Sequence, residues 1–216
     1  MGHGLHFVKY QGSGNCLIIH KKLGGVVKNP RILNGIRVKF VGDNSTLEIY
    51  NPRALRGSKF VIGAANNIKI APGCSGAITV YGGHHSVIEI GENSALAKTR
   101  FILAGVDNAS ITVGRDCLFA NGVLLYGSDT HQILDKNHKQ ILNDCKKSLE
   151  IGNHVWCGVN AIILKGSKIP DNSIVGAGAV VSRRFDVPNV IIAGNPARVV
   201  REDIDWDTAA IMDGIR

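Results

Sequence analysis

The sequence predicts an all-β fold, a parallel β-helix in which short strands coil into a triangular prism, and three observations support it. Glycine is abundant, with 26 residues, and aromatic residues make up only 6%. Small residues also recur at a period of six, at Val155, Ala161, Ser167, Ser173 and Ala179, each four positions after one of the first five inward positions named next. The inward positions themselves are aliphatic or thiol residues at a period of six, at Ile151, Cys157, Ile163, Ile169, Val175 and Val181. This period fits neither an α-helix nor a flat strand, and it is typical of hexapeptide coils.

Each hexad is predicted to form one short strand and one corner. Three hexads then make a coil of about 18 residues, and coils stack at the strand spacing of about 4.8 Å. The aliphatic residue points into the prism, and the small residue lies near the corner, where a bulky side chain would clash. Gly152, Gly158 and Gly176 follow the aliphatic position, where the backbone bends tightly.

The chain is predicted to form a single domain, because 216 residues suffice for one sizeable core. Residues 1–40 are basic and rich in glycine, and we expect them to cap the open end of the solenoid. Coils are expected over 41–182. The period weakens upstream of residue 113 and is ragged before residue 90, which predicts irregular coils there.

The segment 183–216 is expected to leave the coils and end in a short helix. The repeat stops after Val181, and the tail from Glu202 has apolar residues at roughly helical spacing, at Ile204, Ala209 and Ile211. Acidic residues early in this tail suit the dipole of a helix.

One segment interrupts the repeat, and we expect it to be a loop over about 128–148. Leu125 and Ile151 lie 26 positions apart, where uninterrupted coils would give 24 or 30. A polar, lysine-rich stretch fills the interval. Residues inserted into a solenoid project from one face as a loop, and such loops tend to carry function. A tolerated surface insertion is the alternative.

Composition limits the function classes. The five cysteines are scattered and form no CxxC pair, which favours a reducing compartment and argues against a disulfide framework or a zinc ribbon. Neither a membrane-spanning run nor a signal-peptide core is present, so we expect a soluble, cytoplasmic protein without membrane insertion and without a nucleic-acid partner. The net charge of +8 suits an acidic ligand or a merely soluble basic surface.

Three segments of the C-terminal third resemble a known family. IGNHVWCG (151–158), VGAGAVV (175–181) and AGNPAR (193–198) are similar to the IGxxVWIG, IGAGSVV and AGNPAR segments of the hexapeptide-repeat acyltransferases, in the same order and spacing. SDTHQILD (128–135) is similar to the SDxHxIxD segment of the bacterial capsule-polysaccharide and sugar O-acetyltransferases, including those that act on polysialic acid. The resemblance covers roughly residues 110–202.

The resemblance implies a left-handed β-helix, a hand that periodicity alone does not supply. It also implies a homotrimer that binds acetyl-CoA between neighbouring subunits and transfers the acetyl group to a hydroxyl of a sugar or polysaccharide. An acidic polysaccharide would suit the basic N-terminal region through long-range steering, which weakens with salt. That region contains Lys9, Lys21, Lys22, Lys28, Arg31, Arg37 and Lys39.

His131 is the candidate catalytic residue. A sugar hydroxyl needs a base as it attacks a thioester, and an imidazole titrates near neutrality. Asp129, Asp135 or a backbone carbonyl is a candidate to orient that imidazole, although either aspartate suits a simple turn role. Trp156 ends its hexad and should face outward, and the resemblance implies that it lines the acceptor or pantetheine side of the cleft. Packing against another subunit is the alternative for Trp156.

The resemblance also assigns contacts to coenzyme A. Its phosphates favour arginine, and the corners of the coils would contact it through backbone and small side chains. The matching positions are Val159, Ala177, Ser182, Arg183, Arg198 and Arg201. No metal is expected to take part.

Three alternatives remain open from the sequence. The first is an acetyltransferase of the same fold that acts on an antibiotic, an amino sugar or serine. The second is a zinc lyase of the γ-carbonic-anhydrase type, which uses histidines from neighbouring subunits. The third is a β-helix scaffold without catalytic activity.

Overall fold

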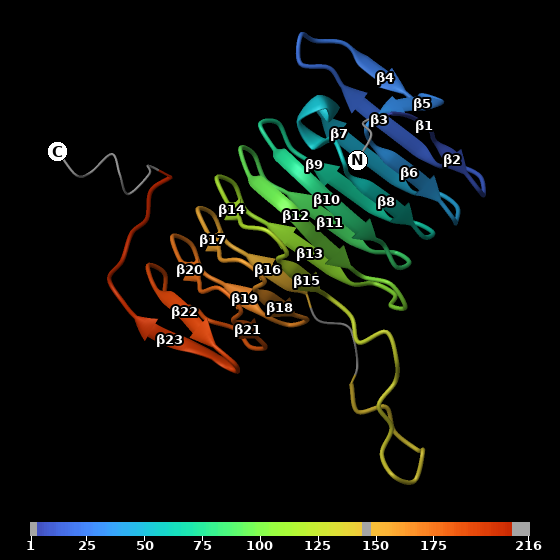
Figure 1. Ribbon diagram of the computed structural model, residues 1–216. Helices are drawn as coiled ribbons and strands as arrows, with labels where there is room; N and C mark the ends of the chain where they lie inside the picture. Colours follow the sequence, from blue (N-terminus) through green and yellow to red (C-terminus); the bar gives the residue numbers. More distant parts are fainter. Residues whose placement is uncertain (1–3, 144–147, 209–216) are drawn as a thin grey trace, which may run out of the picture.

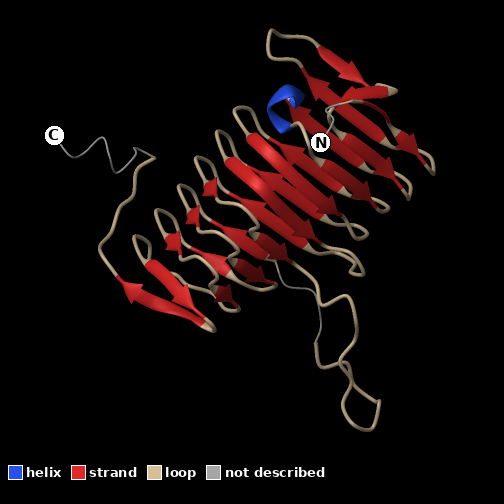
Figure 2. Cartoon of the chain, viewed as in Figure 1, coloured by secondary structure: helices blue, strands red, loops and turns tan. Residues whose placement is uncertain are grey.

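The computed structural model describes residues 4–143 and 148–208, which form an elongated solenoid (Figure 1). It contains 23 strands and one short turn of 3-10 helix, η1 (Pro52–Leu55). Figure 2 shows that strands make up nearly all of its regular structure. The fold is a left-handed parallel β-helix, so the predicted fold class is confirmed. No helix within the described ranges is long and apolar enough to cross a membrane.

Parallel strands stack into three faces. The first face contains β3 (Cys16–His20), β7 (Thr46–Tyr50), β9 (Asn67–Ile70), β11 (Val87–Ile90), β13 (Ser110–Val113), β16 (Leu149–Ile151) and β19 (Lys168–Ile169), with β4 (Val26–Lys28) antiparallel at its edge. The second face contains β14 (Leu118–Phe119), β17 (Trp156–Cys157), β20 (Ile174–Val175) and β22 (Ile191–Gly194), with β23 (Ala197–Arg201) antiparallel to β22.

The third face contains β2 (Lys9–Tyr10), β6 (Arg37–Phe40), β8 (Lys59–Ile62), β15 (Leu124–Tyr126), β18 (Ile162–Leu164) and β21 (Val180–Val181). Two long strands, β10 (Ser75–Tyr81) and β12 (Ala95–Ile102), bend across the second and third faces. The first half of β12 pairs with β14 and its second half with β15, so one long strand becomes two in the next coil.

The core is a set of stacked rows, because alternate side chains of each strand point into the prism. On the first face one row is fully in register and wholly apolar. Its members are Leu47, Ile68, Ile88, Ile111 and Leu149, each at most 1% exposed. Like side chains therefore stack from coil to coil, which explains why the sequence repeats the same residue types.

The upstream coils stack as parallel strands, but their lengths vary, as the irregular coils predicted from the sequence would. Phe60, Val80, Phe101 and Leu125 stand in register on the third face, so successive coils contain 20, 21 and 24 residues. Ile163 and Val181 are separated by the 18 residues of three hexads. The upstream coils have longer strands, and a period of six cannot trace them.

Stacking also begins earlier than the cap boundary expected at residue 40. β2 pairs in parallel with β6, and β3 pairs in parallel with β7, so residues 9–20 already belong to a coil. The end of the solenoid is covered by two antiparallel pairings, β3 with β4 and β1 (Leu5–Phe7) with β5 (Ile32–Asn34). β4 occupies the open edge of the first face, whereas β1 and β5 form a separate two-stranded sheet.

A long excursion leaves the solenoid after β15 and returns at β16 (Figure 1). It projects well away from the stacked coils, as an arm rather than a cover over one face. Leu134 and Ile141 form an isolated antiparallel bridge, and the Leu142 N–H donates to the carbonyl of Ile133 at 2.7 Å. Residues 144–147 lie outside the described ranges.

The helix predicted from Glu202 is absent over residues 202–208, which run without regular structure along the coils. Backbone groups of this tail bond to the solenoid instead of to one another: the Ile204 N–H donates to the carbonyl of Asn189 at 3.0 Å, and the Asn189 amide donates to the carbonyl of Ile204 at 2.9 Å. The rest of the predicted helix, residues 209–216, lies outside the described ranges.

Candidate active site

Most of the candidate residues lie along the two edges of the third face. We call the edge shared with the first face the loop corner, which contains residues 127–143, Lys165–Ser167 and Ser182–Arg183. We call the edge shared with the second face the glycine corner, which contains Gly158–Val159 and Gly176–Ala177. The strand order fixes this division, because β18 and β21 run from the glycine corner to the loop corner.

His131 lies at the beginning of the arm with an exposed imidazole. Its backbone is held on both sides: its N–H donates to the carbonyl of Asp129 at 2.6 Å, and its carbonyl accepts from Asn143 Nδ2 at 2.8 Å. The imidazole itself makes no hydrogen bond or ion pair with any residue in the described ranges. The structure thus fixes the position of His131 and leaves its ring open to another molecule.

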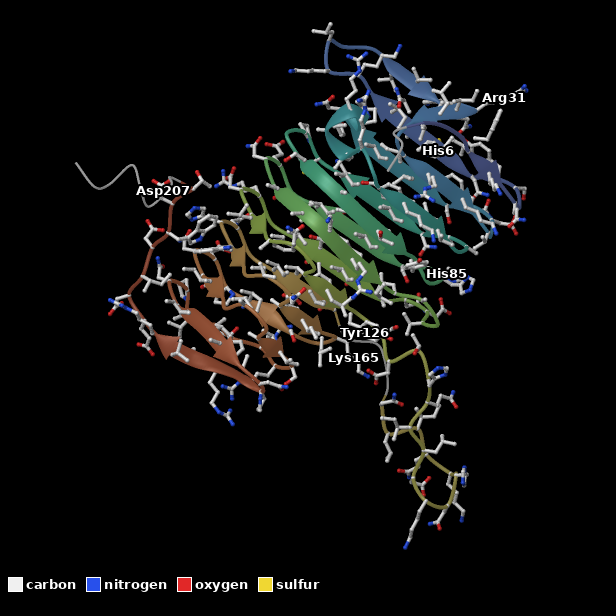
Figure 3. The ribbon with its side chains drawn as sticks, in the orientation of Figure 1. His6, Arg31, His85, Tyr126, Lys165 and Asp207 are labelled. Carbon is white, nitrogen blue, oxygen red and sulfur yellow. The ribbon has the colours of Figure 1, made fainter. Side chains whose placement is uncertain are left out.

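Asp129 anchors the arm to the loop corner. Lys165 Nζ lies 2.6 Å from its Oδ2, and Asn143 Nδ2 donates to the same oxygen at 2.7 Å. Figure 3 shows Lys165 and Tyr126 beside the root of the arm. Burial raises the pKa of Asp129, but the hydrogen bonds from Lys165 and Asn143 and the charge of Lys165 lower it more, so the pKa lies below its ordinary value.

Asp135 has a turn role. Its carboxylate accepts from the backbone N–H groups of Asn137, Lys139 and Gln140 at 2.7–3.2 Å. The hydrogen bond from Gln140 is the main reason that the pKa of Asp135 is lowered. Neither aspartate contacts the ring of His131, so the orienting interaction expected from the sequence is not formed within the chain.

The glycine corner brings Val159 and Ala177 together in neighbouring coils. The Gly178 N–H donates to the carbonyl of Val159 at 2.9 Å, and a Cβ at Gly158 would lie 2.6 Å from the backbone nitrogen of Ala177. Such close stacking leaves a smooth edge on which the Val159 side chain is 47% exposed.

Two of the predicted arginines lie in the strand that ends the second face. Arg198 pairs with Ala193 in the β22–β23 hairpin, and Arg201 pairs with Ile191. Ala193 continues the glycine corner, since a Cβ at Gly176 would lie 3.0 Å from its Cβ. The register therefore places Arg198 next to the end of the glycine corner.

The loop corner carries Ser182 and Arg183 in its last coil. The Arg183 guanidinium lies over the ring of Phe185, 4.9 Å from its centroid. Its neighbour Arg184 forms two hydrogen bonds of 3.2 Å with the carboxylate of Glu150. The two adjacent arginines thus differ: Arg184 is neutralised within the first face, whereas Arg183 has no acidic partner in the described ranges.

Trp156 faces outward from β17 and is 38% exposed, as its place in the hexad predicts. The sequence analysis missed its neighbour Trp206. This side chain is 8% exposed, it stacks on His154 at a centroid distance of 4.2 Å, and its Nε1–H donates to the His154 carbonyl at 2.8 Å. The rings of Trp206 and Trp156 are 6.1 Å apart. No periodic signal marks Trp206, because it lies in the tail.

The buried cysteines offer no thiolate nucleophile. Burial raises the pKa of Cys117 to about 11, and it raises the pKa of Cys157 and Cys74 as well. Over 4–143 and 148–208, no three His, Cys, Asp or Glu side chains gather as a metal-binding group.

These residues do not meet in one pocket of the chain. The glycine corner and the loop corner lie on opposite edges of the third face, and Trp156 is on the second. Two hollows of the described surface lie elsewhere, one of about 410 Å³ over β16 and β19 and one of about 560 Å³ over β2, β6 and β8.

Comparison with known proteins identifies the family. No family model matches the chain. A polysialic acid O-acetyltransferase of Neisseria meningitidis is 30% identical over 204 residues, which cover 94% of this chain and 90% of that protein. The chain belongs to the hexapeptide-repeat acetyltransferases. The resemblance found in the sequence is thereby confirmed.

Other relatives of this hexapeptide-repeat acetyltransferase match over different lengths. The galactoside O-acetyltransferase of Escherichia coli (strain K12) is 39% identical over 104 residues, and the match spans about half of each chain, 47% of this one and 49% of the relative. The crystal structure of the polySia specific acetyltransferase NeuO superposes with a TM-score of 0.79 at 26% identity, covering 95% of this chain and 92% of that one. The whole solenoid is thus shared, including the coils before residue 110.

Proposed function

We propose that this protein transfers an acetyl group from acetyl-CoA to a hydroxyl of a sugar in a bacterial surface polysaccharide. The relative that matches nearly the full chain is named for O-acetylation of polysialic acid. Another, which matches about half of the chain, is named for O-acetylation of galactosides. The observation that supports the proposal most is the placement of His131. Its backbone is fixed at the root of the arm, while its imidazole is exposed and makes no bond to described residues.

In the proposed reaction His131 is the general base. It accepts the proton of the attacking hydroxyl as the sugar oxygen bonds to the thioester carbonyl carbon. The tetrahedral intermediate carries an oxyanion, which a backbone N–H would stabilise. When the C–S bond breaks, the imidazolium returns the proton to the leaving thiolate, and the products are the acetylated sugar and coenzyme A.

The donor is proposed to lie along the third face. Val159 and Ala177 would contact its pantetheine arm at the glycine corner, where the chain is smooth. Ser182, Arg183, Arg198 and Arg201 would bind its polar end, because arginine forms charge-assisted hydrogen bonds with phosphates. Arg183 is suited to this role, because Arg184 and not Arg183 pairs with Glu150.

A homotrimer is proposed from the character of the three faces. The outward row of the first face is polar and of mixed charge, and its members are Glu48, Lys69, Glu89, Thr112, Glu150 and Lys168. The corresponding rows of the other faces are apolar in the C-terminal half, with Leu118, Trp156, Ile174 and Ile191 on the second and Leu124, Ile162 and Val180 on the third. Two different apolar faces suit a closed ring of heterologous contacts.

The arm supports the same assembly. Ile133, Leu134, Ile141 and Leu142 are exposed on it, and an isolated arm gains nothing from four apolar side chains in water. A neighbouring protomer could cover them. It could also supply the residues that orient His131 and complete the cleft. The scattered cysteines and the donor suit a cytoplasmic site for this reaction.

Mass spectrometry tests the activity. The purified protein would be incubated with acetyl-CoA and with polysialic acid, a galactoside or an amino sugar, and the acceptor would be examined for a gain of one acetyl group. Modification of a sugar hydroxyl supports the proposal. Acetylation of an amine, or of no acceptor at all, would contradict it.

A further inference from the structure

A strip of cations runs along the outward side of the third face in its N-terminal half. In one row Arg37, Lys59, Thr79, Arg100 and Leu124 are in register, and in the next row Lys9 aligns with Lys39. We call Lys9, Arg37, Lys39, Lys59 and Arg100 the basic strip. The parallel coils bring these five side chains to one surface from positions up to 91 residues apart in the sequence.

The basic strip has a single sign of charge. The strands that form the third face contain no acidic residue, and each of them is fully described. The first face differs, since Glu48 aligns with Lys69 and Lys69 with Glu89. A surface in which cations are not neutralised by neighbouring carboxylates attracts an anionic partner.

The N-terminal end of the strip is hollowed. A groove of about 560 Å³ lies over β2, β6 and β8, and the side chains of β1 form part of its wall. Lys9, Arg37, Lys39 and Lys59 line it together with Leu5 and Phe7, which are 72% and 74% exposed. Apolar and cationic groups thus line one groove, a combination that suits a carbohydrate with carboxylates.

The strip leads towards the candidate base. The row that begins at Lys9 and Lys39 continues through Val61, Tyr81 and Ile102 to Tyr126. Lys59 Nζ donates to the Tyr81 hydroxyl at 3.0 Å within this path. Tyr126 ends β15, and the arm that carries His131 follows it (Figure 3). Five steps of about 4.8 Å separate the two ends, a span of about 24 Å.

We propose that the basic strip is a distal subsite for an anionic polysaccharide, which it holds along the third face while another part of the same polymer reaches His131. This inference rests on the proposed function and adds the substrate class: a polymer with a carboxylate on its repeating unit. A monosaccharide cannot span the strip and the arm together. The strip therefore distinguishes polymeric from monomeric acceptors.

The test uses the triple variant Arg37→Ala/Lys59→Ala/Arg100→Ala, with Arg53→Ala/Lys69→Ala/Arg115→Ala as a control that removes the same charge elsewhere. We expect the strip variant to raise the KM for polysialic acid about tenfold or more and to change kcat/KM for free sialic acid by less than about twofold. Its KM should also lose most of the salt dependence of the wild-type protein. The control should behave as wild type.

Binding is measured separately, by fluorescence anisotropy of labelled polysialic acid without acetyl-CoA. The inference is supported if the strip variant binds the polymer more weakly than both the wild type and the control variant. Equal binding by all three proteins overturns it, and so does tighter binding of a double-stranded DNA of equal charge. If wild type binds the polymer through the strip but acetylates no sugar, the proposed function fails and the subsite stands. A melting temperature equal to that of the wild type verifies that each variant is folded.

Discussion

Lys165 Nζ lies 2.6 Å from Asp129 Oδ2 and so ties the root of the arm to the coil below it. Both side chains are partly covered, with 17% and 30% of their surfaces exposed. Asn143, at the other end of the arm, donates to the same carboxylate oxygen. One carboxylate therefore joins the two ends of the arm to the solenoid, and His131 lies only two residues away.

This anchor should depend on pH. The folded-state pKa of Asp129 is lower than its ordinary value, so the ion pair stabilises the arm fully above pH about 4 and this contribution is lost as the pH falls through the folded-state pKa. Hydrogen exchange of the His131 amide, corrected for intrinsic rates, should speed up over that range. In Asp129→Asn the exchange should be fast at every pH, and a normal acid response in this variant would assign the effect to another group.

His131→Ala should lower kcat by at least about 100-fold, because the proposed reaction assigns removal of the hydroxyl proton to this imidazole. The matched control is His138→Ala, which removes an exposed histidine from the same arm. Turnover is measured with acetyl-CoA and polysialic acid. Retained activity in His131→Ala, with an unchanged oligomeric state, would remove the base assignment.

Arg183→Ala should raise the KM for acetyl-CoA about tenfold, with a smaller effect on kcat, because a charge-assisted hydrogen bond to phosphate contributes about 1.5–3 kcal/mol. The adjacent Arg184→Ala serves as a control of equal charge, since Arg184 already pairs with Glu150. Steady-state kinetics with varied acetyl-CoA separates the two. Equal effects of both substitutions would show that only net charge matters.

Trp206 should fasten the tail to the coils. Trp206→Phe keeps a ring on His154 but loses the hydrogen bond to its carbonyl, and we expect it to cost about 0.5–1.5 kcal/mol. Trp206→Ala removes the stacking as well and should cost about 2–4 kcal/mol. Chemical denaturation measures both. If Trp206→Ala is as stable as wild type, the tail does not contribute to folding.

Gly63 should tolerate no side chain. A Cβ there would overlap the carbonyl oxygen of Gly83 in the next coil, so Gly63→Ala should destabilise the fold by about 1–3 kcal/mol. The control is Gly82→Ala, where the nearest atom would lie 3.6 Å away, and we expect a change within about 0.5 kcal/mol. Thermal unfolding compares the two. Equal melting temperatures would contradict the close stacking of these coils.

The sequence predicted the C-terminal coils well, because the 18-residue coils there have corners of constant length. It predicted only irregular coils upstream and could not place β7 to β12, because coils of 20 to 24 residues hide any period. It also predicted a helix from Glu202, because apolar spacing describes an isolated segment. The tail instead bonds to Asn189 and places Trp206 on His154, contacts that no local pattern records.

By itself the sequence determined that this chain forms a stack of strands with an interrupted coil and an exposed histidine in the interruption, since one repeated residue environment dictates each hexad. The tertiary structure alone decided which distant residues share a surface. Strand register carries Arg37, Lys59 and Arg100 onto one row and holds Asp129 against Lys165. Register depends on how many residues each corner contains, and those numbers differ from coil to coil, so they are fixed only when the coils pack.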